Sequence, residues 1–296
     1  THTGADYQDL FVERFRNGSS HQYQFKGDWL PAESYHETIQ VRDADSVHLD
    51  VTVTHHGSVI VGEPAKGFGI AFRYTATADA NKWAESLLTM LRAKSADELD
   101  ESMGVWVDPC NNFLFADVHG NIGYRTRGQV PVRSKANAWL PVPGWTGEHE
   151  WDGIVPFEEM PSIRNPDAGY IVTANNRVVE DGYPHYIALD FAPGFRAQRI
   201  TDRLLALSKA RVEDMTAVHA DRTSIPGKAF AQLISRVTPL DKGSTEAIAR
   251  LASWDGAIDT EAVEPTIYHA IRDRLVSNVL TPILGPLANE GLRAQG

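Results

Sequence analysis

Short β-type runs fill the first part of the chain, and this pattern constrains the fold more than any other feature. From residue 1 to about 175, alternating or β-branched segments are separated by turn residues, as is typical of antiparallel sheet. The predicted strands are residues 9–14, 21–25, 37–41, 46–54, 58–61, 69–74, 113–117, 122–127 and 170–173. His119, Gly120 and Asn121 separate two of these runs and predict a tight turn that joins them in a hairpin.

Helical periodicity dominates after residue 195. Apolar residues recur three and four positions apart in segments 197–208, 212–219, 228–235, 244–253 and 266–278. Segment 79–94 predicts one earlier helix, and Ser95 followed by Glu98 predicts the capped start of a second. Strands and helices in separate blocks indicate an α+β architecture rather than alternating βαβ units. We therefore expect antiparallel sheet in roughly the first 175 residues, followed mainly by helices.

Charge and cysteine content bear on partners and stability. The formal net charge is -11, whereas phosphate backbones and anionic membrane surfaces attract clustered Lys and Arg, so we expect no nucleic-acid partner. A single cysteine, Cys110, permits no intramolecular disulfide. No apolar run approaches the ~20 residues that a membrane-spanning helix needs, and we expect no membrane span.

The motifs of several enzyme classes are missing. H-E-x-x-H, the P-loop, the dinucleotide-binding glycine pattern and G-x-S-x-G do not occur in the sequence. His55 and His56 are adjacent, so we expect them to point to opposite faces of a sheet, which favours a structural role over zinc binding. Cys110 is interpreted as a small buried hydrophobic residue, with a nucleophilic role as the alternative.

Two adjacent amides follow the predicted strand 170–173. Asn175 and Asn176 would be delivered at its end. A buried Asn NH2 aimed at a developing negative oxygen lowers the barrier of acyl transfer, and loss of such a donor costs roughly 3 kcal/mol. An Asn-Asn pair also favours a simple turn, because Asn tolerates left-handed backbone and bonds to its own main chain. Both interpretations are open at this level.

Two further groups of charged residues are candidates for a site. Asp6 and Asp9 place two carboxylates on one turn, which suits a hard cation such as calcium, although turn and capping roles explain them equally simply. Arg196 and Arg199 begin the helical half, where a guanidinium could orient an amide or a substrate carboxylate. The alternative is a surface arginine paired with Asp202.

Taken together, the chain resembles the penicillin acylase (penicillin amidase) family of N-terminal-nucleophile hydrolases. The matching segments occur in the family's order over nearly the whole chain: T-G-A-D-Y-Q-D-L-F-V-E-R, H-G-S-V-I, A-F-R-Y, D-P-C-N-N-F-L-F-A-D-V-H-G-N-I-G-Y, P-V-P-G-W, W-D-G-I-V-P-F-E-E-M-P, G-Y-I-V-T-A-N-N-R, F-R-A-Q-R-I and L-A-S-W-D-G. The resemblance implies part of an αββα sandwich. Residues 1–296 would form one continuous segment from the central part of the β chain, with 1–175 mostly β and 195–296 mostly α.

The resemblance also implies roles for individual residues. Asn175 would be the side-chain donor to the oxyanion, and the backbone N–H of His2 would be the second donor. Arg196, or alternatively Arg199, would support the site. No cofactor would be required. A structural calcium ion would be held by residues of the family's ligand set, namely Asp6, the carbonyl of Gln8, Asp9, Asp190 and a carbonyl of Pro141 or Pro143.

The same resemblance places the nucleophile outside the chain. In the family, a serine freed at the start of the β chain attacks the substrate, some tens of residues before the T-G-A-D motif, which begins here at Thr3. We therefore expect the α chain and the start of the β chain to be absent, and the isolated chain to be inactive. Thr1 with its own amine is an alternative nucleophile. It is disfavoured because the match places it beside the oxyanion hole.

The expected function is hydrolysis of the amide between an acyl group and an amine such as a β-lactam nucleus, a homoserine lactone or a lipopeptide. The partners would be this small-molecule substrate and the remaining parts of the same precursor, in the periplasm or outside a bacterial cell. The alternative function is a non-catalytic module that binds an acyl ligand. Trp145, Trp151 and Phe157 could line its groove, with burial in the core as the competing role for each.

Overall fold

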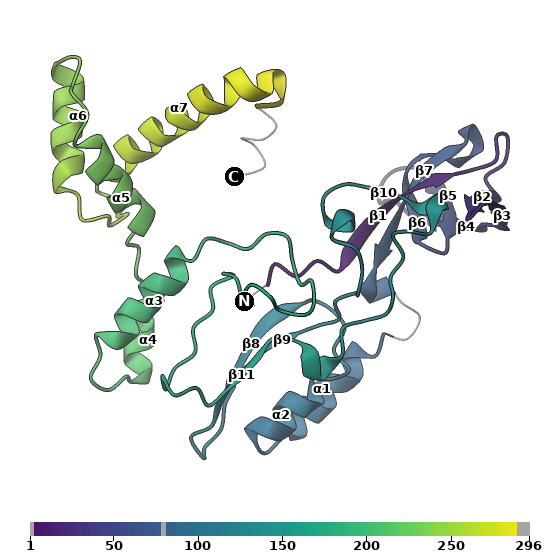
Figure 1. Ribbon diagram of the computed structural model, residues 1–296, viewed down its shortest axis with the longest axis horizontal. Helices are drawn as coiled ribbons and strands as arrows, with labels where there is room; N and C mark the ends of the chain where they lie inside the picture. Colours follow the sequence, from purple (N-terminus) through teal and green to yellow (C-terminus); the bar gives the residue numbers. More distant parts are fainter. Residues whose placement is uncertain (1–2, 78–80, 289–296) are drawn as a thin grey trace. The chain divides into compact units, whose positions relative to one another are not determined.

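A computed structural model describes residues 3–77 and 81–288 of the chain (Figure 1). The chain divides into two compact units, Thr1–Gly194 and Phe195–Gly296. Strands dominate the first unit, and the second is built from helices.

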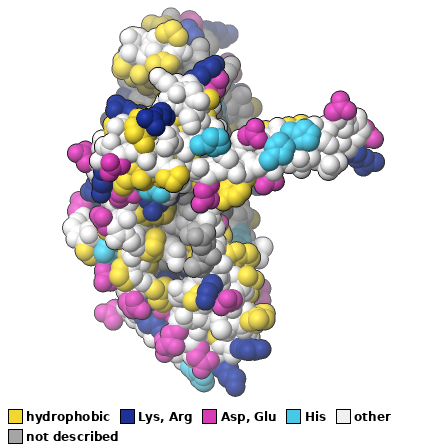
Figure 2. Space-filling view, turned by 90° about the vertical axis from the view of Figure 1, so that its right-hand side faces the viewer, with side chains coloured by type: hydrophobic (Ala, Val, Ile, Leu, Met, Phe, Trp, Pro, Cys, Tyr) yellow, Lys and Arg dark blue, Asp and Glu magenta, His cyan; other side chains and the backbone are white. Residues whose placement is uncertain are grey.

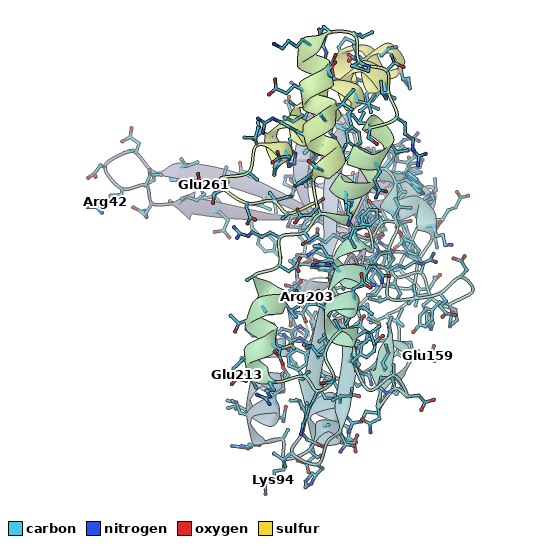
Figure 3. All side chains as sticks on the ribbon, turned by 90° about the vertical axis from the view of Figure 1, so that its left-hand side faces the viewer. Arg42, Lys94, Glu159, Arg203, Glu213 and Glu261 are labelled. Atoms are coloured by element: carbon cyan, nitrogen blue, oxygen red, sulfur yellow. The ribbon has the colours of Figure 1, made fainter. Side chains whose placement is uncertain are left out.

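The first unit contains a six-stranded sheet in the order β10-β1-β7-β6-β5-β4. Neighbouring strands are antiparallel except for β1 and β10, which are parallel. The strands are β1 (Gln8–Arg14), β4 (Glu33–Ile39), β5 (Val47–Thr54), β6 (Gly57–Glu63), β7 (Phe68–Tyr74) and β10 (Val142–Pro143). Every second residue of β1 is buried, because successive side chains of a strand point to opposite faces. Figure 3 shows Arg42 at the tip of the β4–β5 hairpin.

Two smaller sheets complete the β-structure. One has the order β11-β9-β8, from Ser162–Arg164, Ile122–Arg127 and Asn111–Ala116, and the other pairs β2 (Gln22–Phe25) with β3 (Asp28–Pro31). The hairpin predicted around Gly120 is confirmed between β8 and β9. The Asp117 carboxylate accepts hydrogen bonds from the N–H groups of His119 (2.9 Å) and Asn121 (3.0 Å), which fixes the turn.

Among its described residues, the first unit has two α-helices, α1 (Trp83–Arg92) and α2 (Ala96–Ser102). Ser95 caps α2 as predicted, since its hydroxyl accepts from the N–H of Glu98 at 3.1 Å. The Glu98 carboxylate bonds to the N–H of Lys94 at 2.8 Å. An ion pair between Arg125 of β9 and Asp100 of α2 connects the helix to the sheet. Short 3-10 turns lie at Pro64–Lys66, Thr75–Thr77, Lys135–Ala138, Gly144–Thr146 and Phe157–Glu159.

The buried apolar residues of the first unit form two clusters. The larger one brings together the N-terminal segment, the residue before β8 and the loops after β9, through Ala5, Cys110, Val130, Val155, Met160 and Ile187. The smaller one lies on the six-stranded sheet and consists of Phe11, Ala71 and Val142. The larger cluster underlies the candidate site, because the segment around Ile187 packs on it.

The second unit consists of the helices α3 (Phe195–Leu205), α4 (Val212–His219), α5 (Ile225–Ile234), α6 (Lys242–Ser253) and α7 (Glu264–Leu284), followed by a 3-10 turn at Gly285–Leu287. Its core contains Ala231, Leu251, Trp254 and Tyr268, contributed by α5, α6, the residue that ends α6, and α7. Figure 3 shows Arg203 on α3 and Glu213 on α4.

The α+β expectation is confirmed, but the predicted strand 170–173 is wrong. These residues have no regular secondary structure, so Asn175 is not carried at the end of a strand. A β-branched run forms a strand only where a neighbouring strand offers hydrogen bonds. Conversely, β3, β10 and β11 were not predicted, because they have two to four residues and two of them contain proline.

The surface is mixed in charge. Figure 2 shows acidic and basic side chains interspersed with apolar ones over one face of the molecule. Within the part of the chain that the structure describes, no helix combines the length and apolarity needed to cross a membrane.

Candidate active site

The two adjacent asparagines differ in what they do locally. Asn176 holds the turn, because its side-chain oxygen accepts from the N–H of Ala174 (3.0 Å) and its NH2 donates to the carbonyl of Arg177 (3.0 Å). Asn175 takes the left-handed conformation, with φ of 64°, and its carbonyl accepts from the N–H of Ala192 at 2.9 Å. Left-handed residues other than glycine are uncommon and cluster at functional sites. The half-buried Asn175 therefore suits both interpretations of the pair, and its role as oxyanion donor stays a prediction.

The loop beyond Asn175 is fixed to the N-terminal segment. Asp6 donates its N–H to the carbonyl of Ile187 at 2.8 Å. Its carboxylate accepts from the N–H of Leu189 at 3.1 Å and from the hydroxyl of Tyr186. Gly4 has no space for a side chain, since a Cβ there would lie 2.4 Å from the carbonyl oxygen of Asp190. Residues 4–6 and 186–191 thus form one packed layer.

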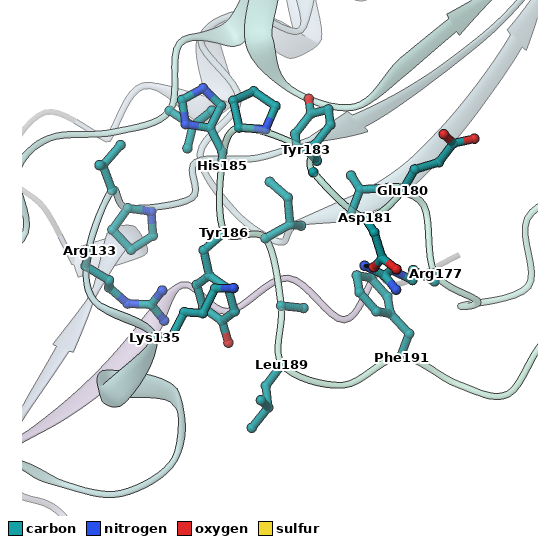
Figure 4. Close-up of a pocket in the computed structure, with 18 residues that line it drawn as sticks. Arg133, Lys135, Arg177, Glu180, Asp181, Tyr183, His185, Tyr186, Leu189 and Phe191 are labelled. Carbon is teal, nitrogen blue, oxygen red and sulfur yellow. Dashed lines mark hydrogen bonds and ion pairs between the residues drawn. The ribbon is translucent and has the colours of Figure 1, made fainter.

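A cavity of about 620 Å³ lies beside this layer (Figure 4). Arg133, Lys135 and Tyr186 are close together on one side of it, whereas Arg177 and Asp181 lie near Phe191 on another side. Arg133 and Lys135 approach the Tyr186 ring to 5.4 and 5.9 Å from its centroid. A volume of this size is in the range of small-molecule sites.

Asp9 forms a buried ion pair with Arg133. The guanidinium Nε lies 2.5 Å from Asp9 Oδ2, and both side chains are fully buried. The same oxygen also accepts from Trp151 Nε1 at 2.6 Å and from Asn137 Nδ2 at 3.2 Å. Removing two charges from water is costly, and the hydrogen bonds to Oδ2 offset part of that cost, whereas Asp9 Oδ1 and both Nη atoms of Arg133 are buried without a partner among the described residues. Asp9 therefore has a clear structural role.

This arrangement does not fit a calcium ion well. Calcium takes six to eight oxygen ligands, whereas Asp9 is already neutralised by a guanidinium and Asp6 is bonded to Tyr186 and Leu189. The carboxylates of Asp6, Asp9 and Asp190 are not all within 4.8 Å of one another among the described residues. Gln8 begins β1 with its side chain exposed, and Asp190 is also exposed. Calcium binding stays a prediction.

The predicted arginines belong to the second unit. Arg196 is exposed in the first turn of α3. Arg199 forms a two-pronged ion pair with Asp221, with Nε to Oδ1 at 3.0 Å and Nη2 to Oδ2 at 2.7 Å, rather than with Asp202. Their predicted support of Asn175, a residue of the first unit, stays a prediction. His2 lies outside the described residues.

Cys110 has the structural role expected for it. Its side chain is buried, and its sulfur lies 3.6 Å from the carbonyl oxygen of Gln129. Burial, reinforced by the charge of Asp108, raises the pKa of the thiol well above its usual value. The reactive form of cysteine is the thiolate, so this residue is a poor nucleophile.

The three aromatic residues considered for a ligand groove have different neighbours. Trp151 lines a second cavity, of about 600 Å³. The guanidinium of Arg14 lies over the Trp145 ring, 3.6 Å from its centroid. That of Arg125 lies over Phe157 at 4.1 Å. All three rings are half-buried.

His55 and His56 do not point to opposite sheet faces, so that expectation was wrong. They form the two-residue turn between β5 and β6, and their ring centroids are only 3.7 Å apart. The alternation rule holds within a strand and fails in a turn. The fully buried His56 lies between two carboxylates, with Nδ1 2.7 Å from Glu13 and Nε2 2.7 Å from Glu150. Burial disfavours the charged imidazole, but the hydrogen bonds to these carboxylates outweigh it and raise the pKa of His56.

Sequence reasoning missed this cluster. Glu150 is 94 residues from His56, and no motif or residue spacing in the sequence predicts their contact. The signal that was available is T-H-H-G between two β-runs, which matches a two-residue hairpin and would have placed both rings at one end of the sheet.

Comparison with known proteins identifies the family. A profile of the Penicillin amidase family matches residues 1–295. Penicillin acylase 2 proenzyme from Pseudomonas sp. (strain SE83) is 36% identical over 276 residues, covering 93% of this chain and 36% of that protein. Acyl-homoserine lactone acylase QuiP from Pseudomonas syringae pv. tomato is 27% identical over 300 residues, covering 95% of this chain and 36% of that protein. Penicillin G acylase from Escherichia coli is 29% identical over 267 residues, covering 85% and 30%.

A solved structure supports the same fold. Thermostable penicillin G acylase from Alcaligenes faecalis matches with a TM-score of 0.80 and 22% identity, covering 96% of this chain and 53% of that one. The expected fold, that of the N-terminal-nucleophile hydrolases, is confirmed. The chain spans about a third of the length of the curated relatives it matches. From residue 1 to residue 295, the chain belongs to the penicillin amidase family.

Proposed function

We propose that this chain is the part of an amide hydrolase that stabilises the oxyanion during removal of an acyl group from an amine. The observation that carries the proposal is the turn at Asn175, where Asn176 satisfies the backbone and Asn175 takes the left-handed conformation. Relatives are named for penicillins and for acyl-homoserine lactones. These names support amides of a β-lactam nucleus and of a homoserine lactone as substrate classes.

In the proposed reaction, a serine hydroxyl from outside this chain adds to the substrate carbonyl and gives its proton to its own α-amino group. The NH2 of Asn175 and the backbone N–H of His2 donate to the oxygen that becomes negative, and Arg196 supports the site. Collapse of the intermediate breaks the C–N bond, and the amine leaves with the proton. Water then hydrolyses the acyl ester and regenerates the serine.

The source of the nucleophile follows from the same proposal. Cys110, the single cysteine, is buried with a raised pKa, and so does not supply an attacking group. The chain would act with an α chain and the start of a β chain from the same precursor, in the periplasm or outside the cell. If the assembled protein binds a calcium ion, the ion would have a structural role and no part in the reaction. Asp9 would then have to give up its pairing with Arg133.

The proposal is tested by hydrolysis of phenylacetyl and fatty-acyl p-nitroanilides. The 296-residue chain alone is expected to release no p-nitroaniline above the buffer rate. Turnover by this chain that disappears in Thr1→Ala would contradict the external nucleophile. Saturable binding of phenylacetate or a fatty acid by a longer polypeptide that also contains an α chain and the start of a β chain, without turnover, would support the alternative function, a non-catalytic acyl-binding module.

The role of Asn175 is tested in a longer, active polypeptide that includes this chain. Asn175→Gly keeps a residue that adopts positive φ freely and removes only the amide. We expect kcat to fall by roughly 10²- to 10³-fold. Asn165 is the matched control, since it also has positive φ (42°) and is exposed, and Asn165→Gly should leave kcat unchanged. Equal kcat values for the two variants would remove Asn175 from the mechanism.

A further inference from the structure

Three potential metal ligands converge at the β5–β6 turn of the first unit. His55, His56 and Glu150 each offer one ligand atom, and these atoms all lie within 4.8 Å of one another. The Nε2 atoms of His56 and His55 are 2.7 and 3.7 Å from the same carboxylate oxygen, Oε1 of Glu150. We propose that this cluster binds a divalent late transition metal, with Zn²⁺ as the physiological candidate.

The distances are close to those that a zinc ion would impose. Zn–N and Zn–O bonds of about 2.0–2.2 Å in a tetrahedral shell place neighbouring ligand atoms roughly 3.3 Å apart. The two nitrogen–oxygen distances here, 2.7 and 3.7 Å, lie on either side of that value. The Glu150 side chain is 24% exposed, so a small shift of it would lengthen the shorter distance and shorten the longer one.

Each ligand is also held by a second partner through its other polar atom. His56 Nδ1 bonds to Glu13 at 2.7 Å, and His55 Nδ1 bonds to the hydroxyl of Tyr23 at 2.9 Å. Oε2 of Glu150 lies 3.3 Å from Nη1 of Arg73. Such outer partners fix the tautomer and orientation of metal-binding histidines and are a regular feature of metal sites. Both Nε2 atoms are therefore left to face the same carboxylate oxygen of Glu150.

The ring planes are fixed by aromatic contacts. His56 stacks on Phe11 with ring centroids 3.8 Å apart and an angle of 6°. Phe25 meets the His55 ring edge-on at 4.4 Å. A site whose side chains are already ordered loses little conformational entropy when the ion binds. The cluster is thus preorganised.

The site has an entry path and a suitable charge. His55, His56 and Arg73 line the cavity of about 600 Å³, so a fourth coordination position would open into it. Glu13 and Glu150 contribute two negative charges and Arg73 one positive charge. A metal ion would take the place of the proton on His56 Nε2, and the carboxylates of Glu13 and Glu150 that surround this ring favour a cation there. Two imidazoles and one carboxylate suit zinc better than calcium or magnesium, which prefer all-oxygen shells.

The test is metal titration of the full 296-residue chain, made without a histidine tag and stripped with EDTA. Co²⁺ is the spectroscopic probe, and Zn²⁺ is the competitor. We expect one Co²⁺ per chain with the intense visible bands of a four-coordinate ion, displaced by one equivalent of Zn²⁺. His55→Ala and Glu150→Gln should each weaken binding at least ten-fold. Tyr23→Phe keeps the ring and should weaken it by about ten-fold through the second partner alone.

The matched control is His48→Ala. His48 and His36 form an exposed stacked pair on β5 and β4, with ring centroids 5.6 Å apart, and could bind metal adventitiously. His48→Ala should leave the stoichiometry and affinity unchanged. Loss of binding in this variant, unchanged binding in both His55→Ala and Glu150→Gln, or no stoichiometric binding by the parent chain would overturn the proposal. Circular dichroism identifies a variant that fails to fold, and the other variant then decides.

Discussion

At the residue scale, Asp9 shows how a pattern can indicate one chemistry while the fold uses the residue for another. The spacing of Asp6 and Asp9 suits a calcium turn, but Asp9 pairs with Arg133, 124 residues away. Two carboxylates close together in the sequence are easily recognised as a pattern. The contact with Arg133 cannot be recognised in the same way, because it forms only when the loop after β9 packs on β1. Asn175 is the opposite case, because the preference of asparagine for left-handed backbone is local and was anticipated.

Arg133→Met is expected to lower the free energy of unfolding of the first unit by about 3–5 kcal/mol, because Asp9 would remain buried and charged without its positively charged partner. Urea denaturation measures the change. The control is Arg164→Met, since Arg164 forms an exposed pair with Asp97 and should cost less than about 1 kcal/mol. The double variant Asp9→Asn with Arg133→Met should recover most of the loss. A cost for Arg133→Met no larger than for Arg164→Met would contradict a structural role for the pair.

At the element scale, helices were predicted more reliably than strands. The bounds of α4 agree with the predicted segment, because periodicity and capping are local properties. The strand at 170–173 failed for the reverse reason, since whether a β-type run pairs depends on segments far away in sequence. The orientation of His55 and His56 failed because the alternation rule of a strand was applied to residues that form a turn. The candidate metal cluster could not be predicted because Glu150 lies in a loop 94 residues from His56.

The Arg199–Asp221 pair connects α3 to the segment before α5 and makes the second unit sensitive to acid. The hydrogen bonds from Arg199 hold the pKa of Asp221 well below its ordinary value of 3.8. A lowered folded-state pKa means that the stabilisation is complete above pH 4 and is lost as the pH falls below the ordinary value. Asp221→Asn should therefore lower the urea midpoint at pH 7 and have a smaller effect at pH 3. An effect that grows on acidification would contradict this assignment.

At the scale of the whole molecule, the two units have separate hydrophobic cores. The core of the second unit depends on Leu251, whose side chain is 1% exposed among Trp254, Tyr268 and Ala231. The first unit has its own clusters around Ile187 and Phe11. A defect in one core should therefore act mainly on its own unit.

Leu251→Ala is expected to cost about 2–5 kcal/mol in the second unit through the cavity it creates. Hydrogen exchange followed by mass spectrometry should show faster exchange in α3 to α7 and unchanged exchange in β1 and β7. The matched control is Leu240→Ala, since Leu240 is 96% exposed and should change neither region. Faster exchange of similar size in both units after Leu251→Ala would indicate a single cooperative structure.

β4 is one of the two edge strands of the large sheet, and all seven of its residues are exposed. Its outer side offers main-chain hydrogen-bonding groups to any extended polypeptide that approaches. Glu33 and Glu37 stand on the same strand as Tyr35 and Ile39, and their like charges oppose pairing between two copies. Replacing both carboxylates by neutral groups would remove this repulsion, so that copies of the chain could pair through β4 and aggregate into fibres.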